Sequence, residues 1–220
     1  MVHVWRDAGA RRIAALSTAP HSMNQPFRVR AIPVPDNRDG GTRLPDLRVL
    51  EQNVFRDTRG TFAELWRSDD ARAPGLPTFV QDNLARSRRG VVRGLHFQNP
   101  RAQAKLVTAI EGEIFDVAVD VRAGSPTFGR WAAFTLSEAN GRQLYVPAGF
   151  AHGYQTVSDV SVVIYKCSNF YAPDDERVVR WDDEDLAIPW PVRDTVVSAR
   201  DAAAPRLREL LPQWLPSMDQ

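Results

Sequence analysis

The segment that decides the fold class reads Phe115-Asp-Val-Ala-Val-Asp-Val121. Large apolar side chains alternate in it with acidic or small ones, which is a period of two over the whole segment. Successive side chains of a β-strand point to opposite faces of its sheet. The period therefore predicts a β-strand.

Similar segments lie on the C-terminal side of this one. Trp131–Leu136 and Val160–Lys166 are rich in β-branched and aromatic residues, a composition typical of strands. Turn signals recur between the strands, at Glu111-Gly112, Arg122–Pro126, Asn140-Gly141 and Pro147–Gly149. Short strands at this spacing, without a long helical interlude from Leu47 onward, predict an all-β sandwich or barrel.

The tail holds the one clear helix start. Ser198 can cap a helix, and Asp201 is at its third position, where the helix dipole favours an acid. Leu207, Leu210 and Leu211 then supply an apolar stripe. We expect short helices at the C-terminus.

The bulk composition excludes several classes of function. The net charge of +1 gives no basis for a surface that binds nucleic acid. No apolar run approaches the roughly 20 residues that span a bilayer. Cys167 is the single cysteine, so no disulfide can form within the chain. These features predict a cytoplasmic protein that does not associate with membranes.

Residues 1–44 differ from the rest. They contain seven Arg and three Asp, a net charge of +4, which leaves −3 for residues 45–220. We expect residues 1–44 to be an N-terminal extension and 45–220 to be the main domain. The extension could contain a short helix over Arg6–Leu16, be mobile, or result from a start codon upstream of Met23; Asp7 argues against a transit peptide.

Of the four histidines, His96 and His152 lie in the β-rich region. His152 ends the pattern Pro147-x-Gly-x-x-His, which resembles the second signature of cupin barrels. Metal-binding cupins supply His-x-His and a carboxylate in the first signature, whereas this chain has Gln98 in place of the second histidine. Two imidazoles and an amide are a poor ligand set for iron, manganese or zinc, so we expect no metal.

Eight motifs follow one another between Leu47 and Leu211. They are Gly90–Gln98, Ala102–Leu106, Gly112–Asp120, Ser125–Gly129, Gln143–Pro147, Gly149–Gly153, Tyr165-Lys166 and Trp181–Asp183. In this order they resemble the dTDP-4-dehydrorhamnose 3,5-epimerase family. The resemblance implies a cupin-like jelly roll, a homodimer with strands contributed across the interface, and no cofactor. The substrate it implies is a dTDP-4-keto-6-deoxyhexose.

The resemblance also implies a catalytic set. The ketone at carbon 4 acidifies the protons on carbons 3 and 5, and His96 corresponds to the base that removes them. Asp201 corresponds to the carboxylate that orients His96, although alone it would be taken for N-terminal helix decoration. Tyr165 corresponds to the proton donor on the opposite face of the sugar. Lys105 corresponds to the cation that stabilises the enolate.

Further positions match the family's substrate contacts. Arg59 and Arg93 can hold diphosphate oxygens in a fork, and Phe62 and Tyr171 can pack on thymine. The remaining matched positions are Glu64, Gln81, Asp82, Asn83, His152, Glu176 and Arg200. At the position of Arg200 the family has a lysine, so the positive charge is retained.

One feature of the strand around His96 conflicts with this assignment. Strict alternation puts His96 and Arg93 on opposite faces. Both can serve one pocket if the strand bulges, for which Gly94 is the obvious place; otherwise Arg93 serves a partner's site or a rim.

Three other functions stay open. The chain could invert a single carbon of a related dTDP-4-ketosugar, since such epimerases share this scaffold. It could be a non-catalytic binder of nucleotide sugars, or a metal-dependent cupin. Its product could feed rhamnose for a cell envelope or a deoxysugar for a secondary metabolite.

Overall fold

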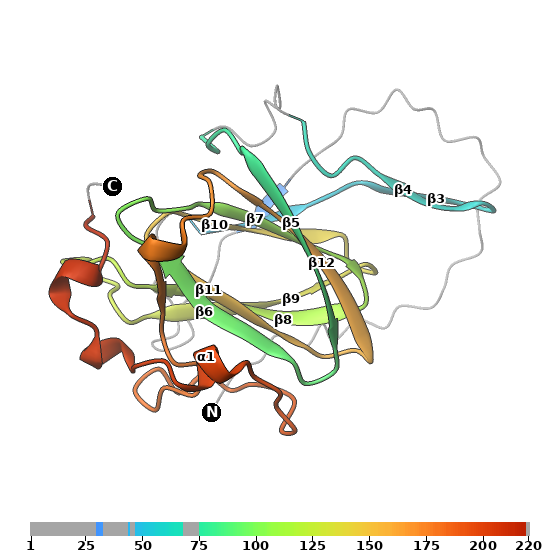
Figure 1. The fold of residues 1–220 in the computed structure, drawn as a ribbon. Coiled ribbons are helices and arrows are strands. Elements are labelled where there is room, and N and C mark those ends of the chain that lie inside the picture. Colours follow the sequence, from blue (N-terminus) through green and yellow to red (C-terminus); the bar gives the residue numbers. More distant parts are fainter. Residues whose placement is uncertain (1–29, 33–43, 45–46, 68–74, 219–220) are drawn as a thin grey trace.

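The computed structural model describes residues 30–32, 44, 47–67 and 75–218. Two antiparallel sheets lie one above the other, and the C-terminal segment covers the lower one (Figure 1). The six-stranded sheet has the order β1-β2-β10-β7-β12-β5, with bounds Arg30–Ile32, Arg48–Glu51, Arg142–Val146, Lys105–Glu111, Val160–Cys167 and Gln81–Arg88. The five-stranded sheet has the order β13-β6-β11-β8-β9, with bounds Glu176–Val178, Val92–Gln98, Phe150–Thr156, Glu113–Asp120 and Trp131–Ser137. The predicted all-β, jelly-roll-like fold is confirmed.

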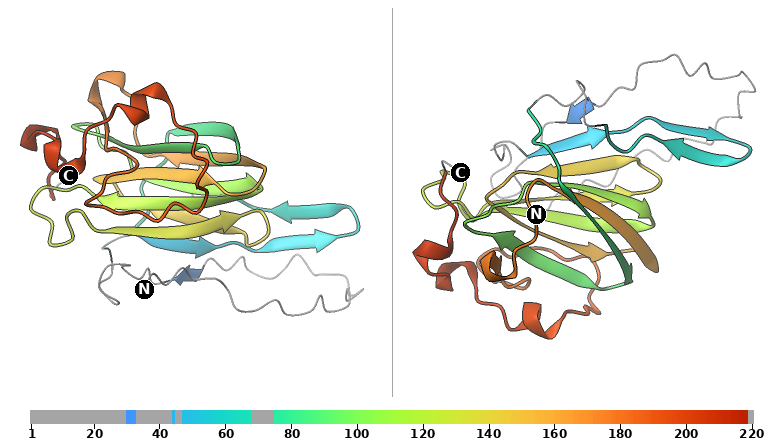
Figure 2. Two further views of the ribbon diagram at one scale, coloured as in Figure 1. Left: turned by 90° about the horizontal axis from the view of Figure 1, so that it is seen from below. Right: turned by 45° about the horizontal axis from the view of Figure 1, so that its top comes forward.

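Several neighbouring strands in each sheet come from distant parts of the chain. β6 is hydrogen-bonded to β11 and β13, and β7 to β10 and β12. A third element, the hairpin of β3 (Val54–Asp57) and β4 (Gly60–Ala63), projects beyond the edge of both sheets (Figures 1 and 2).

The alternating side chains of Phe115–Val121 pack against different parts of the structure on the two faces of β8. Phe115, Val117 and Val119 face away from the other sheet and pack under the C-terminal segment, against residues such as Leu186. The alternate residues face the other sheet, where Ala118 joins the core between the two sheets. Asp116 on this inner face is fully buried as well. Both faces of the strand are therefore covered, and acids lie in the interior.

The core between the sheets is apolar at its centre. Val107, Leu144 and Val163 of the six-stranded sheet pack there against Ile114 and Phe150 of the five-stranded sheet. Tyr165 lies against this cluster and is only partly buried. Tyr165 thus lies at the border of this apolar centre.

The C-terminal helix is shorter than the apolar stripe suggests. Ser198 caps α1 (Ala199–Ala202), as predicted, and its hydroxyl accepts the Asp201 N–H at 3.1 Å. The helix ends after one turn, and Pro205 follows soon after. The predicted short C-terminal helices are present, but the three leucines of the apolar stripe do not lie on α1. Leu207 and Leu210 are buried at a separate 3-10 turn (Leu207–Glu209), whereas Leu211 is 44% exposed.

Two other 3-10 turns are Pro173–Asp175 and Pro212–Trp214. The proposed helix over Arg6–Leu16 lies outside the described residues. Within the part of the chain that the structure describes, no helix is long and apolar enough to cross a membrane.

Candidate active site

The site is built around a hydrogen bond between His96 on β6 and Asp201 in α1. The His96 Nε2 atom lies 2.7 Å from Asp201 Oδ1, and the Gly94 N–H donates to Oδ2 at 3.4 Å. Burial would raise the pKa of Asp201, but the hydrogen bond to His96 and its charge outweigh burial and hold that pKa below its usual value. A charged carboxylate thus orients the imidazole and leaves its other ring nitrogen for proton transfer.

β6 carries the bulge expected at Gly94. In its pairing with β11, His96 faces His152 and Arg93 faces Tyr154, so two residues of β6 oppose the single Gly153. Gly94 has a φ of +116°, and a Cβ on it would lie 2.6 Å from the Gly153 Cα atom. The extra residue reverses the alternation, so Arg93 points to the same side of the five-stranded sheet as His96 although it stays exposed.

Lys105 on β7 lies next to the backbone of His96 and is buried, with 8% of its surface exposed. Its Nζ donates to the His96 carbonyl oxygen at 3.3 Å. Burial lowers the pKa of Lys105, while Cys167 and Glu176 act in the opposite direction. A partly desolvated cation next to His96 can stabilise an anionic oxygen.

Tyr165 lies on β12, in the sheet opposite His96. Burial raises its pKa to about 12. Its hydroxyl is therefore protonated at neutral pH and available as an acid. His96 and Tyr165 thus come from different sheets of the sandwich.

A second histidine–carboxylate pair lies deeper. His152 Nε2 is 2.9 Å from Asp116 Oδ1 and 3.1 Å from Oδ2, and both residues are buried. Burial raises the pKa of Asp116, and His152 counteracts it. Asp116 was not among the predicted site residues. The signal was present, since an acid alternating with valines must face inward when the valines cover the other face.

A cluster of polar residues joins β5, β13 and α1. The Tyr171 hydroxyl donates to Glu176 Oε2 at 2.8 Å, and Arg200 forms an ion pair with the same oxygen. Gln81 accepts the Tyr171 N–H at 2.9 Å and donates to the Asn83 side chain at 3.1 Å. These five predicted contact residues are therefore brought together.

Asp82 is not brought to that cluster. It alternates with Gln81 and Asn83 along β5, and its carboxylate pairs with Lys166 Nζ at 2.8 Å on the other face of the sheet. Asp82 therefore forms an ion pair with the neighbouring strand β12 and does not face the polar cluster.

The hairpin residues also lie apart. Arg59 pairs with Asp57 at 2.6 Å, and its side chain is 88% exposed. Phe62 is 63% exposed, although it lies near Phe55, and Glu64 directly follows β4. Because the hairpin projects away from α1, one chain does not bring these residues to His96 (Figure 1).

The residues near His96 do not form a metal centre. His96 and His152 each bond a carboxylate, and Gln98 is held by backbone groups, donating to the Arg101 carbonyl at 2.8 Å. Among the described residues, no three His, Cys, Asp or Glu side chains lie close enough to hold a metal ion.

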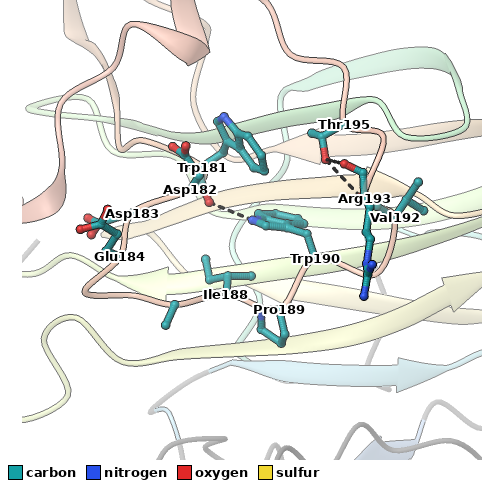
Figure 3. A pocket seen from close by; sticks show the side chains of 11 residues that line it. Trp181, Asp182, Asp183, Glu184, Ile188, Pro189, Trp190, Val192, Arg193 and Thr195 are labelled. Atoms are coloured by element: carbon teal, nitrogen blue, oxygen red, sulfur yellow. Dashed lines mark hydrogen bonds between the residues drawn. The ribbon is translucent and has the colours of Figure 1, made fainter.

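A separate hollow of about 430 Å³ lies in the C-terminal segment, which covers the outer face of the five-stranded sheet (Figure 3). Trp181 and Trp190 line it, and the Trp190 Nε1 donates to the Trp181 carbonyl at 2.8 Å. Asp182 at its wall pairs with Arg180. The hollow holds no histidine–carboxylate pair and is distinct from the site of His96.

A double-sheet protein with a histidine–carboxylate pair, a buried lysine and a neutral tyrosine has the groups needed for proton transfer at carbon. Fold and site together define a cupin-like acid–base enzyme. Residues 41–209 match the model of the dTDP-4-dehydrorhamnose 3,5-epimerase family, to which the chain belongs.

Individual relatives agree with this family. The dTDP-4-dehydrorhamnose 3,5-epimerase of Salmonella typhimurium is 47% identical over 174 residues, which cover 77% of this chain and 95% of the relative. The crystal structure of dTDP-6-deoxy-D-glucose-3,5-epimerase from Legionella pneumophila, in complex with dTDP-4-keto-L-rhamnose, has a TM-score of 0.78 at 39% identity, covering 86% of this chain and 98% of that one. A 3'-monoepimerase from Streptomyces bikiniensis, in complex with dTDP-quinovose, has a TM-score of 0.73 at 37% identity, covering 79% and 90%.

Proposed function

We propose that this protein inverts carbons 3 and 5 of dTDP-4-dehydro-6-deoxy-D-glucose to give dTDP-4-dehydro-L-rhamnose. The observation that carries the proposal is the 2.7 Å contact between His96 and Asp201, inside a fold that belongs to this epimerase family. The catalytic residues are His96, Asp201, Tyr165 and Lys105.

The first step is removal of a proton by His96. The carbon 4 ketone acidifies the neighbouring C–H bonds, and the imidazole takes the proton with the free ring nitrogen. The imidazolium that forms is stabilised by Asp201, whose pKa is held low in the folded protein. The electron pair of the broken C–H bond moves into an enolate whose oxygen lies near Lys105.

The second step is return of a proton to the opposite face. Tyr165 donates its hydroxyl proton, the new C–H bond forms, and the enolate reverts to the ketone. His96 then loses its proton to water, and Tyr165 regains one. One proton leaves carbon and one returns with no change of oxidation state, so this reaction requires no redox cofactor.

We assign substrate binding to the residues that surround this centre. Arg93 and Arg200 supply positive charge for the diphosphate, and Tyr171 supplies a ring for thymine. The same chain also contributes Gln81, Asn83, Glu176 and His152 to the pocket. Asp82 is left out of this assignment because it pairs with Lys166 on the other face of β5.

We further propose a homodimer in which the hairpin of one chain enters the pocket of its partner. The exposed Phe62 and the exposed Arg59, on a hairpin that leaves its own sandwich, support this arrangement. Glu64 follows the same strand. The substrate pocket would then be completed by residues of both chains.

We assign residues 1–44 to an extension of the epimerase domain, because the family match begins at residue 41. Within it, β1 pairs with β2 at the edge of the sheet. We assign the protein to the cytoplasm, where its single cysteine would stay reduced.

Proton NMR of the enzyme and substrate in deuterated water tests the proposed activity. Deuterium should enter carbon 3 and carbon 5, and both centres should invert. His96→Asn should abolish exchange at both carbons. If the wild-type protein incorporates no deuterium, the proposed activity is wrong.

Inversion of a single carbon is the second candidate. It is favoured by the Streptomyces bikiniensis structure, a 3'-monoepimerase with the same fold. The same spectra separate the two, because a single-centre enzyme would leave one carbon without inversion.

A further inference from the structure

Arg93 connects the two sheets at the edge of the site. It lies on β6, and its Nε donates to the Ser87 hydroxyl on β5 at 3.0 Å. Ser87 is buried, with 5% of its surface exposed, whereas Arg93 is exposed to solvent. The bond uses Nε, so it fixes the plane of the guanidinium and leaves both terminal nitrogens for other contacts.

Tyr154 is the second neighbour of Arg93. The two residues face each other across β6 and β11, and Tyr154 is 3% exposed. Its buried hydroxyl meets no partner at full hydrogen-bond geometry. Burial raises the pKa of Tyr154, while the Ser87 hydroxyl and the Arg93 charge lower it, so both groups lie close to this hydroxyl.

Tyr165 lies on the same face of the six-stranded sheet as Ser87, because it faces Asn83 in the pairing of β12 with β5, and Asn83 and Ser87 share the inner face of β5. The charge of Arg93, which is held at Ser87, acts on Tyr165. Burial is the main cause of the high pKa of Tyr165, and Cys167, Tyr154 and Glu176 add to it. Arg93 acts against all of them and favours the deprotonated form. A tyrosine that must give its proton to carbon needs such a cation, because the donation leaves a phenolate in a partly buried place.

We propose that Ser87 is a positioning residue that holds the Arg93 guanidinium where it stabilises the phenolate of Tyr165. This inference rests on the proposed epimerase function. The Tyr165 O–H bond breaks as the new C–H bond forms, the enolate returns to the ketone, and the negative charge passes to the phenolate oxygen. Arg93 offsets that charge until water restores the proton.

The alternative is that Ser87 merely ties the two sheets together. A ratio of two rates separates these roles. In deuterated water, His96 can remove a proton and return a deuteron on the same face, which gives exchange without inversion. Tyr165 returns a proton from the other face, which gives inversion. The ratio of inversion to exchange therefore reports on Tyr165 and does not depend on the folded fraction or on substrate affinity.

The experiment measures this ratio by NMR for S87A, S87T and a matched control, S161A. Ser161 faces Ser87 across β5 and β12, is fully buried, and lies 2.8 Å from the Thr156 hydroxyl. We expect S87A to lower the ratio about tenfold, as the loss of a hydrogen bond to a charged group would. S87T retains the hydroxyl and should stay within about twofold of the wild type, and S161A should leave the ratio unchanged.

Three outcomes would overturn the inference: an unchanged ratio in S87A, an equal fall in S161A, or a failure of S87T to restore the ratio. If S87A does not fold, R93M tests the role of Arg93 in its place, because an exposed side chain can be replaced without disturbing the core. We expect R93M to lower the ratio about 100-fold, and an unchanged ratio there would refute the role. Absence of exchange in the wild type would refute the epimerase function itself, which is a different result.

Discussion

The substitution Asp201→Asn tests the central pair most directly. Asparagine has nearly the same shape as aspartate, so the 2.7 Å contact with His96 can persist while the negative charge is lost. At an effective dielectric constant of about 20, two unit charges about 3 Å apart attract each other by roughly 5 to 6 kcal/mol. That is an upper bound, because the His96 side chain is 29% exposed and water screens it.

The usual energy of a charge-assisted hydrogen bond gives a better value for the energy lost in Asp201→Asn. Such bonds contribute about 2 to 3 kcal/mol, which corresponds to a fall in kcat of about 30- to 150-fold. Because Asp201 touches the base and not the sugar in this mechanism, KM should stay close to that of the wild type. The assay is the initial rate of inversion at saturating substrate, followed by NMR.

A matched control separates the charge from the helix that carries it. Ser198→Ala removes the cap of α1, which costs about 1 kcal/mol of stability, and leaves the carboxylate in place. We expect its kcat to remain within about threefold of the wild type. If Asp201→Asn also stays within that range, or if both variants fall equally, the carboxylate does not act on His96 as argued.

Three further predictions concern stability, pH and assembly. Gly94→Ala should lower the free energy of unfolding by about 2 to 4 kcal/mol, because its Cβ would meet backbone at 2.6 Å; Gly60→Ala, also at positive φ but with nothing within 4 Å, is the calorimetric control and should lose much less. Burial favours a higher pKa for Asp120, but hydrogen bonds from a neighbouring arginine and two hydroxyls hold it below the unfolded value. Its stabilisation is therefore present above about pH 4 and lost as the pH falls through the folded pKa, so Asp120→Asn should flatten the decline of Tm in acid; an unchanged slope would contradict this. The F62A and H96N variants, each inactive alone, can be dissociated and mixed. If hairpins are exchanged, one site of each mixed dimer has both His96 and Phe62, so about a quarter of the wild-type sites should be active. No recovery of activity would place the hairpin outside the partner's pocket.

Local patterns were sufficient to find three of the strands. β8, β9 and β12 begin and end within two residues of the segments Phe115–Val121, Trp131–Leu136 and Val160–Lys166. The bulge at Gly94 was also predictable, because placing His96 on the same face as Arg93 required an extra residue there. Period and backbone freedom are properties of neighbouring residues, so they can be read without knowing the fold.

The site itself was predicted through resemblance more than through pattern. His96 and Asp201 are 105 positions apart, and Asp201 alone would be taken for a helix-capping acid. Asp82 matched the family but lies on the wrong face of β5, where Lys166 holds it. No sequence pattern pointed to Ser87, because its proposed role depends on a hydrogen bond from an arginine of the opposite sheet.

The sequence by itself determined the period of the strands, the cap at Ser198 and the kinds of side chain available for acid–base chemistry. Tertiary structure decided which face of each strand is covered, and so turned Asp116 into a buried partner of His152. It also decided that the hairpin with Phe62 leaves its own sandwich. The physical reason is that burial and charge pairing arise from contacts between segments distant in the chain, and such contacts exist only once the two sheets have packed together.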